Sequence, residues 1–94
     1  MNLQQLRLKI DEIDEELIRL FLRRLSLSAE VAKFKYKSNI PIHDSNREQQ
    51  KLNDIVLSIP CEYRDYITEL YTQIFKISRT EQQRIINEQS KSKI

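Results

Sequence analysis

The sequence predicts an all-α protein of three helices: one long, one short and one of medium length. Three observations lead to this prediction. Apolar residues recur at alternating steps of three and four along the first third of the chain, the spacing of a helix that packs along one seam. The chain contains no glycine, which disfavours the tight turns of β-hairpins. Its two prolines, Pro41 and Pro60, separate this first stretch from two further stretches with helical spacing.

The long helix is expected over residues 3–36, which contain neither a proline nor a cluster of turn residues. Residues 37–41 end it, because the residue before a proline resists the α conformation. Its apolar seam consists of Leu3, Leu6, Ile10, Ile13, Leu17, Leu20, Leu27, Val31 and Phe34.

The short helix is expected over residues 45–58 and the medium helix over residues 63–86, followed by a polar tail, residues 87–94, that frays. Asp44 or Ser45 can cap the first turn of the short helix, and Ser45 with Glu48 also fits a capping box. The apolar faces of these two helices consist of Leu52, Ile55, Val56 and Ile59, and of Tyr63, Ile67, Leu70, Ile74 and Ile77.

The size of the chain predicts a single domain over residues 1–94 that functions as a dimer. A helix of about 33 residues is roughly 50 Å long. A compact chain of this size has a radius of gyration of about 12 Å and a diameter of roughly 30 Å. The long helix therefore extends beyond any compact monomer and needs a second chain to cover its seam, for which a symmetric homodimer is the simplest arrangement.

The composition excludes several kinds of site. Without glycine there is no Walker loop, dinucleotide fingerprint or EF-hand loop. One cysteine and one histidine cannot supply the soft ligands of a zinc site, and the single Cys61 forms no intrachain disulfide. The net charge of +2 is too small to indicate nucleic-acid binding. We therefore expect no metal and no nucleic-acid partner.

The N-terminal sequence has no apolar signal core, and no stretch approaches 18 apolar residues. A lone cysteine also fits a reducing compartment. We expect a cytoplasmic protein that does not associate with a membrane.

Arg24 interrupts the apolar seam of the long helix. A charge in an apolar setting is costly unless it is paired, so Arg24 needs an anionic partner. Lys35 follows 11 residues later on the same face, about 16 Å along the helix axis. The two cations could hold one small anion between them. The structural alternative is that Arg24 forms a salt bridge or fixes the register of the seam.

Three further polar residues attract attention by their spacing. Arg7 precedes Arg24 by 17 residues, about 25 Å of helix, so one small ligand cannot contact both within one chain. Arg7 is therefore either a surface charge or part of a site completed by another chain. Ser78 and Gln82 stand at i, i+4 on one helix face, either as ligand-binding groups or as an ordinary polar face.

These positions, with their spacings, match one pattern over residues 3 to about 83. The matching residues in chain order are Leu6, Arg7, Ile10, Asp11, Ile13, Asp14, Leu17, Ile18, Leu20, Arg24, Leu27, Val31, Ala32, Lys35, Pro41, Ile42, Asp44, Arg47, Glu48, Ser78 and Gln82. In this pattern the sequence resembles the all-α, AroQ-class chorismate mutases. The segment of residues 53–62 is shorter than in a bacterial member of that family.

The resemblance implies a homodimer of intertwined chains with two equivalent sites, each built from both chains. It also implies the reaction: chorismate is converted to prephenate by a [3,3]-sigmatropic Claisen rearrangement in phenylalanine and tyrosine biosynthesis. This chemistry uses no metal, cofactor or covalent intermediate. The enzyme would be an isomerase that holds the reactive chair conformation of a dicarboxylate and stabilises charge in the transition state.

The resemblance also assigns roles to the cations and to one amide. Lys35 and Gln82 are expected to donate to the ether oxygen, where negative charge develops. Arg24 is expected to bind one substrate carboxylate, and Arg7 of the second chain to bind the other. Arginine suits carboxylates because its planar fork can bind them through two parallel hydrogen bonds.

Four other residues have supporting roles by resemblance. Ser78 supports the ring carboxylate, Glu48 accepts a hydrogen bond from the ring hydroxyl, the Asp44 backbone lies nearby, and Arg47 adjusts the local charge. An isochorismate-pyruvate lyase of the same fold is the closest alternative, which Glu48 disfavours because it supplies the partner for the hydroxyl. A helical dimerisation module without catalysis is the second alternative.

Overall fold

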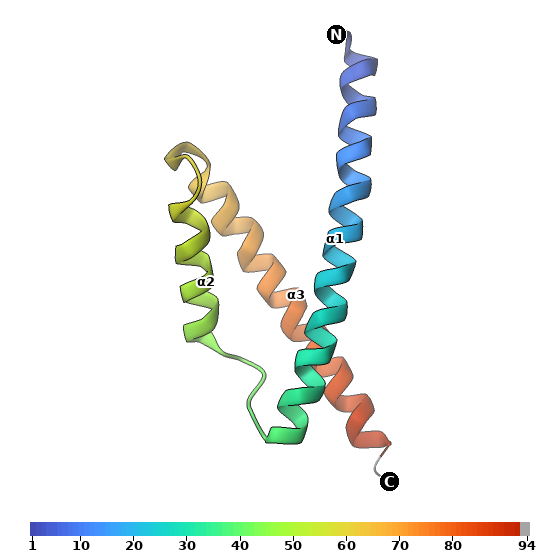
Figure 1. The fold of residues 1–94 in the computed structure, drawn as a ribbon, viewed down its shortest axis with the longest axis vertical. Coiled ribbons are helices and arrows are strands. Elements are labelled where there is room, and N and C mark those ends of the chain that lie inside the picture. The colour runs from blue at the N-terminus through green and yellow to red at the C-terminus, as the bar shows by residue number, and fades with distance from the viewer. Residues whose placement is uncertain (93–94) are drawn as a thin grey trace.

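The computed structural model describes residues 1–92 and folds them into three α-helices and one short 3-10 helix. These are α1 (Leu3–Ser38), α2 (Ser45–Leu57), the 3-10 helix η1 (Cys61–Tyr63) and α3 (Arg64–Lys91). The prediction of an all-α fold with a long, a short and a medium helix is confirmed for this part of the chain. Figure 1 shows α1 and α3 crossing, with α2 beside the first part of α3.

Both ends of α1 are capped by asparagine. The Asn2 side chain accepts a hydrogen bond from the Gln5 backbone N–H at 2.8 Å, and the Gln5 side chain accepts one from the Asn2 backbone N–H at 2.9 Å. At the other end Asn39 adopts a left-handed conformation with φ of 54°, which asparagine tolerates better than most residues. The helix therefore ends at Ser38, two residues later than predicted.

The N-cap of α2 is Asp44, whose carboxylate accepts a hydrogen bond from the Arg47 backbone N–H at 2.9 Å. The alternative capping box of Ser45 with Glu48 is therefore wrong, and the Glu48 side chain is available for another contact. The helix ends at Leu57, one residue before the predicted end.

The third helix begins after the η1 turn and continues to Lys91, beyond the predicted end at residue 86. Side-chain pairs one turn apart support this extension. Gln83 donates to Asn87 at 2.9 Å, and Arg84 bonds Glu81 at 2.6 Å and Glu88 at 2.7 Å. The hydrogen bond to Glu81 raises the pKa of Arg84. The predicted fraying from residue 87 is thus corrected up to Lys91, and residues 93–94 of the tail lie outside the described residues.

The described chain has a small core and an elongated shape. Its buried apolar residues are Ala32, Phe75 and Ile85. The radius of gyration is 17.0 Å and the principal extents are 59 × 28 × 14 Å. A compact chain of this length would have a radius of gyration of about 12 Å.

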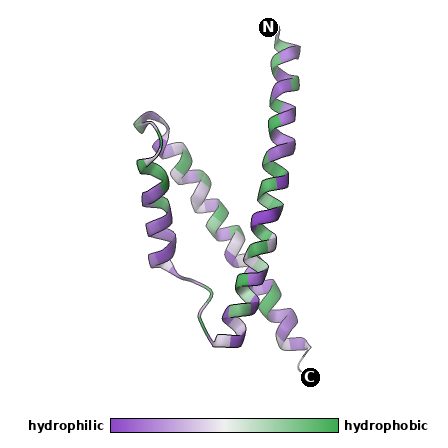
Figure 2. Ribbon diagram, in the orientation of Figure 1, coloured by the Kyte–Doolittle hydropathy of each residue, from purple (hydrophilic) through white to green (hydrophobic). Residues whose placement is uncertain are grey.

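The N-terminal half of α1 extends away from the other two helices (Figure 1). Every residue up to Leu20 is exposed, including the predicted seam residues in this half. Figure 2 shows that apolar residues continue along this free half between the polar ones. The predicted seam is therefore present on the helix but nothing within the described chain covers it. None of the helices in residues 1–92 has an apolar stretch long enough to cross a membrane.

Candidate active site

A cavity of about 300 Å³ lies between the C-terminal half of α1, the start of α2 and the middle of α3. Its wall consists of Arg24, Leu27, Ser28, Val31, Lys35, Ile42, Asp44, Arg47, Glu48, Lys51, Phe75, Ser78, Arg79 and Gln82. Seven of the eight residues that the sequence singled out line this cavity. The exception is Arg7, which lies on the exposed half of α1.

Arg24 on α1 lies against the aromatic wall of the cavity. Its guanidinium carbon is 5.9 Å from the centre of the Phe75 ring, within the range of a cation–π interaction. No carboxylate in residues 1–92 forms an ion pair with Arg24. The structural salt bridge considered from the sequence is therefore absent from the described chain, and the guanidinium N–H groups remain available to an anion.

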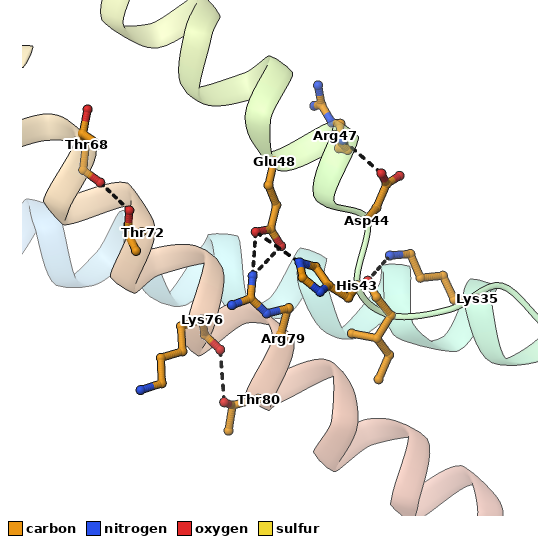
Figure 3. A network of polar contacts seen from close by, with 11 residues as sticks. Lys35, His43, Asp44, Arg47, Glu48, Thr68, Thr72, Lys76, Arg79 and Thr80 are labelled. Atoms are coloured by element: carbon orange, nitrogen blue, oxygen red, sulfur yellow. Dashed lines mark hydrogen bonds and ion pairs between the residues drawn. The ribbon is translucent and has the colours of Figure 1, made fainter.

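Lys35, the second cation of α1, contacts the loop that precedes α2. Its Nζ donates to the Ile42 carbonyl oxygen at 2.7 Å (Figure 3). This bond ties the loop to α1 and holds the half-buried ammonium at the cavity. Because an ammonium has three N–H donors, two remain for a ligand.

Ser78 and Gln82 on α3 are buried, each with 7% of its surface exposed. Ser78 shares a hydrogen bond of 2.6 Å with the Ser28 hydroxyl of α1. The Gln82 side-chain oxygen is buried and has no hydrogen-bond partner in the described chain. Ser78 and Gln82 therefore do not form a solvent-exposed face of α3, since both are buried and line the cavity.

Glu48 connects α2 to α3 through an ion pair. Figure 3 shows Glu48 and Arg79 pointing toward each other, and Nη1 of Arg79 donates to both carboxylate oxygens at 2.6 Å. His43 Nε2 lies 3.8 Å from one of these oxygens. Asp44 uses its carboxylate to cap α2, and the Arg47 side chain is exposed at the cavity edge.

Arg79, Phe75 and Lys51 line the cavity but were not among the predicted site residues. Helical spacing could have indicated Arg79 and Phe75. Phe75 precedes Ser78 by three residues and Arg79 by four, so these side chains share one face of α3. Lys51 likewise follows Glu48 by three residues on α2.

The cavity carries an excess of three positive charges. Its charged residues are the cations Arg24, Lys35, Arg47, Lys51 and Arg79 and the carboxylates Asp44 and Glu48. A cleft lined mainly by one sign of charge attracts ligands of the opposite sign. In the part of the chain that the structure describes, no three His, Cys, Asp or Glu side chains are placed to share a metal ion. The arrangement suits a small molecule with more than one negative charge.

Comparison with known families agrees with this geometry. The family model described as chorismate mutase type II matches residues 6–83. The chain belongs to this family. The matched region contains all eight predicted site residues, including Arg7, which lies outside the cavity of the single chain.

Several similar proteins are named as chorismate mutases or as bifunctional enzymes that include one. The chain is 34% identical over 85 residues to the bifunctional chorismate mutase/prephenate dehydratase of Escherichia coli K12, covering 88% of this chain and 22% of that protein. It is 44% identical over 48 residues to the chorismate mutase of Methanocaldococcus jannaschii, covering 51% of this chain and 48% of the relative. The match to the Aquifex aeolicus bifunctional enzyme is 41% identical over 55 residues, covering 58% of this chain and 15% of that protein.

These matches cover less than half of each relative's length, and only 15% to 22% of the two bifunctional proteins. The similarity to the bifunctional enzymes therefore concerns one segment of each. No solved structure matches the chain.

Proposed function

We propose that this chain is a chorismate mutase, an isomerase that rearranges chorismate to prephenate on the route to phenylalanine and tyrosine. The supporting observation is the cavity between the three helices, which combines cations for a dicarboxylate with buried neutral donors. Membership of the chorismate mutase type II family supports chorismate as the substrate. The reaction is a concerted rearrangement that exchanges no electrons or groups with another molecule, so the proposed mechanism includes no cofactor.

Arg24 binds one substrate carboxylate and helps to hold the reactive chair. The extended ground state of the substrate must fold so that its two carbon ends meet. Clamping the carboxylates in that geometry removes the entropic part of the barrier before the chemical step. The position of Arg24 over the Phe75 ring supports this role, because the ring restrains the guanidinium without neutralising it.

Lys35 and Gln82 act on the ether oxygen. In the transition state the C–O bond breaks ahead of C–C bond formation, so negative charge grows on this oxygen. Donors aimed there stabilise the transition state more than the substrate. The bond between Lys35 and the Ile42 carbonyl supports the proposal, because it fixes the ammonium before the substrate arrives. The Gln82 side chain is buried at the cavity, and the N–H groups of its amide would add a neutral donor.

The remaining site residues hold the ring. Ser78 supports the ring carboxylate and Glu48 accepts a hydrogen bond from the ring hydroxyl. Asp44 contributes its backbone beside that hydroxyl, and Arg47 adjusts the charge at the cavity edge. Their common position around one cavity supports these assignments.

We further propose that two chains intertwine as a homodimer with shared active sites. The support is the free half of α1, whose apolar seam is exposed in the single chain. Covering this seam with the same segment of a second chain would bury it by symmetry. Arg7 of the second chain would then complete the cation set of each cavity and bind the second carboxylate.

An absorbance assay tests the activity directly. Purified protein is mixed with chorismate, the loss of chorismate absorbance is followed, and the product is identified as prephenate. Isochorismate is assayed in parallel, with pyruvate release as the readout for the lyase alternative. No turnover of chorismate by the folded protein would refute the proposed function, and turnover of isochorismate alone would favour the lyase.

A further inference from the structure

The ion pair between Arg79 and Glu48 joins the two helices that form one side of the cavity. The residues are 31 positions apart, and a single nitrogen, Nη1 of Arg79, contacts both carboxylate oxygens at 2.6 Å. The side chains are partly buried, with 31% of Arg79 and 24% of Glu48 exposed. Charge-assisted hydrogen bonds of this kind are among the stronger polar contacts in proteins.

The pair also stands between two cavities. Glu48, Arg79 and Phe75 line the candidate active site, and the same three residues line a second cavity of about 240 Å³ between α2 and α3. A free Glu48 side chain could therefore turn toward either space. The contact of both carboxylate oxygens with Arg79 restricts that freedom.

Burial alone does not fix Glu48. None of the 13 residues of α2 is fully buried, and 24% of the Glu48 side chain is exposed, so burial alone does not define the orientation of its carboxylate. A glutamate side chain has several rotatable bonds, and ordering it has an entropic cost. An ion pair that forms before the substrate binds orders the Glu48 side chain beforehand, so that less entropy is lost on binding.

We propose that Arg79 is a positioning residue that orients the Glu48 carboxylate toward the ring hydroxyl of the substrate. A carboxylate offers about four acceptor sites, and Nη1 of Arg79 uses one on each oxygen. Acceptor capacity therefore remains for the hydroxyl. This inference rests on the proposed function and adds to it a residue that the family resemblance did not supply.

The proposal is tested by a double-mutant cycle of Arg79→Met and Glu48→Gln. Arg84→Met is the matched control, because Arg84 lies on the same helix, also forms ion pairs and does not line the cavity. Each variant is assayed with chorismate and with an analogue that lacks the ring hydroxyl. Circular dichroism checks that each variant is folded, and Arg79→Gln replaces Arg79→Met if the latter does not fold.

If Arg79 acts through Glu48, Arg79→Met lowers kcat/KM for chorismate by about 10-fold but by less than about 3-fold for the analogue. In the Glu48→Gln background it causes little further loss. Arg79→Lys recovers part of the activity, since a single ammonium nitrogen can contact both oxygens. Arg84→Met leaves kcat/KM within about 2-fold of the wild-type value.

Three outcomes would overturn the positioning role in an active enzyme. Arg79→Met could leave chorismate turnover unchanged. It could impair both substrates equally, as expected if Arg79 contacts a substrate carboxylate or only stabilises the fold. It could also cause the same loss with and without Glu48. A wild-type protein inactive toward chorismate would instead refute the proposed function, so the two failures are distinguishable.

Discussion

Lys35 illustrates how one side chain can serve both the fold and the site. Its bond to the Ile42 carbonyl at 2.7 Å ties the loop before α2 to α1, and its remaining donors face the cavity. The sequence predicted that Lys35 shares a helix face with Arg24, because eleven residues come close to three full turns. It could not predict the contact with Ile42, which depends on the path of the loop.

At this scale we expect Lys35→Ala and Arg24→Ala each to lower kcat/KM by at least about 10²-fold, the usual cost of losing one preorganised charged donor. The helices should persist, since both side chains are half-buried at an open cavity. Steady-state kinetics with chorismate measure the loss. Lys33→Ala is the control on the same helix, because Lys33 is exposed and, within residues 1–92, pairs only with Glu30, at 3.4 Å. A Lys35→Ala variant that keeps most of its activity would contradict the proposed mechanism.

The role proposed for Gln82 predicts that the activity of Gln82→Glu depends on pH. An amide donates a hydrogen bond at any pH, whereas a carboxyl group donates only when it is protonated. The introduced carboxyl has an ordinary pKa near 4.3, and burial raises it because the charged form is disfavoured there. Activity should be highest below that pKa and fall as the pH rises through it, when the carboxylate repels the developing negative charge. The measurement is kcat as a function of pH, and a profile parallel to that of the wild type would remove Gln82 from the ether oxygen.

Site residues that share a helix face could be predicted from their spacing in the sequence. Site residues that depend on a contact between two helices could not. Helical geometry predicted that Arg24 shares a helix face with Lys35, and Ser78 with Gln82. The family resemblance assigned these residues to one site, and all four line the cavity. Arg79 was not predicted as a site residue, because its partner Glu48 lies 31 residues away on another helix. Only the packing of α2 against α3 brings those charges together.

At the scale of elements, apolar periodicity predicted each helix, and polar side chains decided where each one ends. The Asn39 cap and the Asp44 cap fix the ends that face the first loop. The end of α3 was predicted too early because residues 87–91 have no clear apolar stripe. Polar pairs such as Gln83 with Asn87 hold that turn instead, and a hydrophobic pattern does not report them.

The exposed apolar seam in the N-terminal half of α1 leads to a prediction about dimerisation. Ile13 is 56% exposed in the single chain, so a polar substitution there would be harmless to a monomer. In the proposed dimer Ile13→Asp places an unpaired carboxylate in a buried seam, twice in each assembly. We expect it to weaken dimerisation by at least about 10²-fold and to reduce the helical circular dichroism signal at micromolar concentration. Sedimentation equilibrium measures the association.

Glu15→Asp is the control for this experiment. It introduces the same residue type into the same part of α1, with its lower helix propensity, at a position that the heptad pattern puts outside the seam. It should leave the dimer intact. A wild-type protein that is folded, active and monomeric at micromolar concentration would contradict the dimer and the role given to the seam.

At the scale of the whole molecule, an elongated chain with a small core carries a cavity whose walls come from all three helices. Helix α1, with 36 residues, accounts for the longest extent of the chain, 59 Å. The elongated shape could therefore be predicted from the length of this helix. The shape of the cavity could not, because it depends on the angle at which α1 and α3 cross (Figure 1). An exposed seam and an excess of cations beside it are the features that a second chain would complete.

The last prediction concerns Arg7, which should act in the site of the other chain. About 25 Å of helix separates it from Arg24, too far for one small ligand. Arg7→Ala and Lys35→Ala homodimers should each have two damaged sites. The two variants are unfolded, mixed in equal amounts and refolded together. A mixed dimer then has one site with both residues intact and one site that lacks both.

Random pairing makes about half of the dimers mixed, so roughly a quarter of the wild-type activity should return, given two equivalent sites in a symmetric dimer. Each variant refolded alone is the control for losses during refolding, and circular dichroism checks that the mixture has regained its helices. If Arg7 served the cavity of its own chain, every site of a mixed dimer would lack one of the two groups and no activity would return. A refolded mixture without recovery would therefore contradict the shared site, because only an exchange of Arg7 between chains can restore an intact cavity from two damaged proteins.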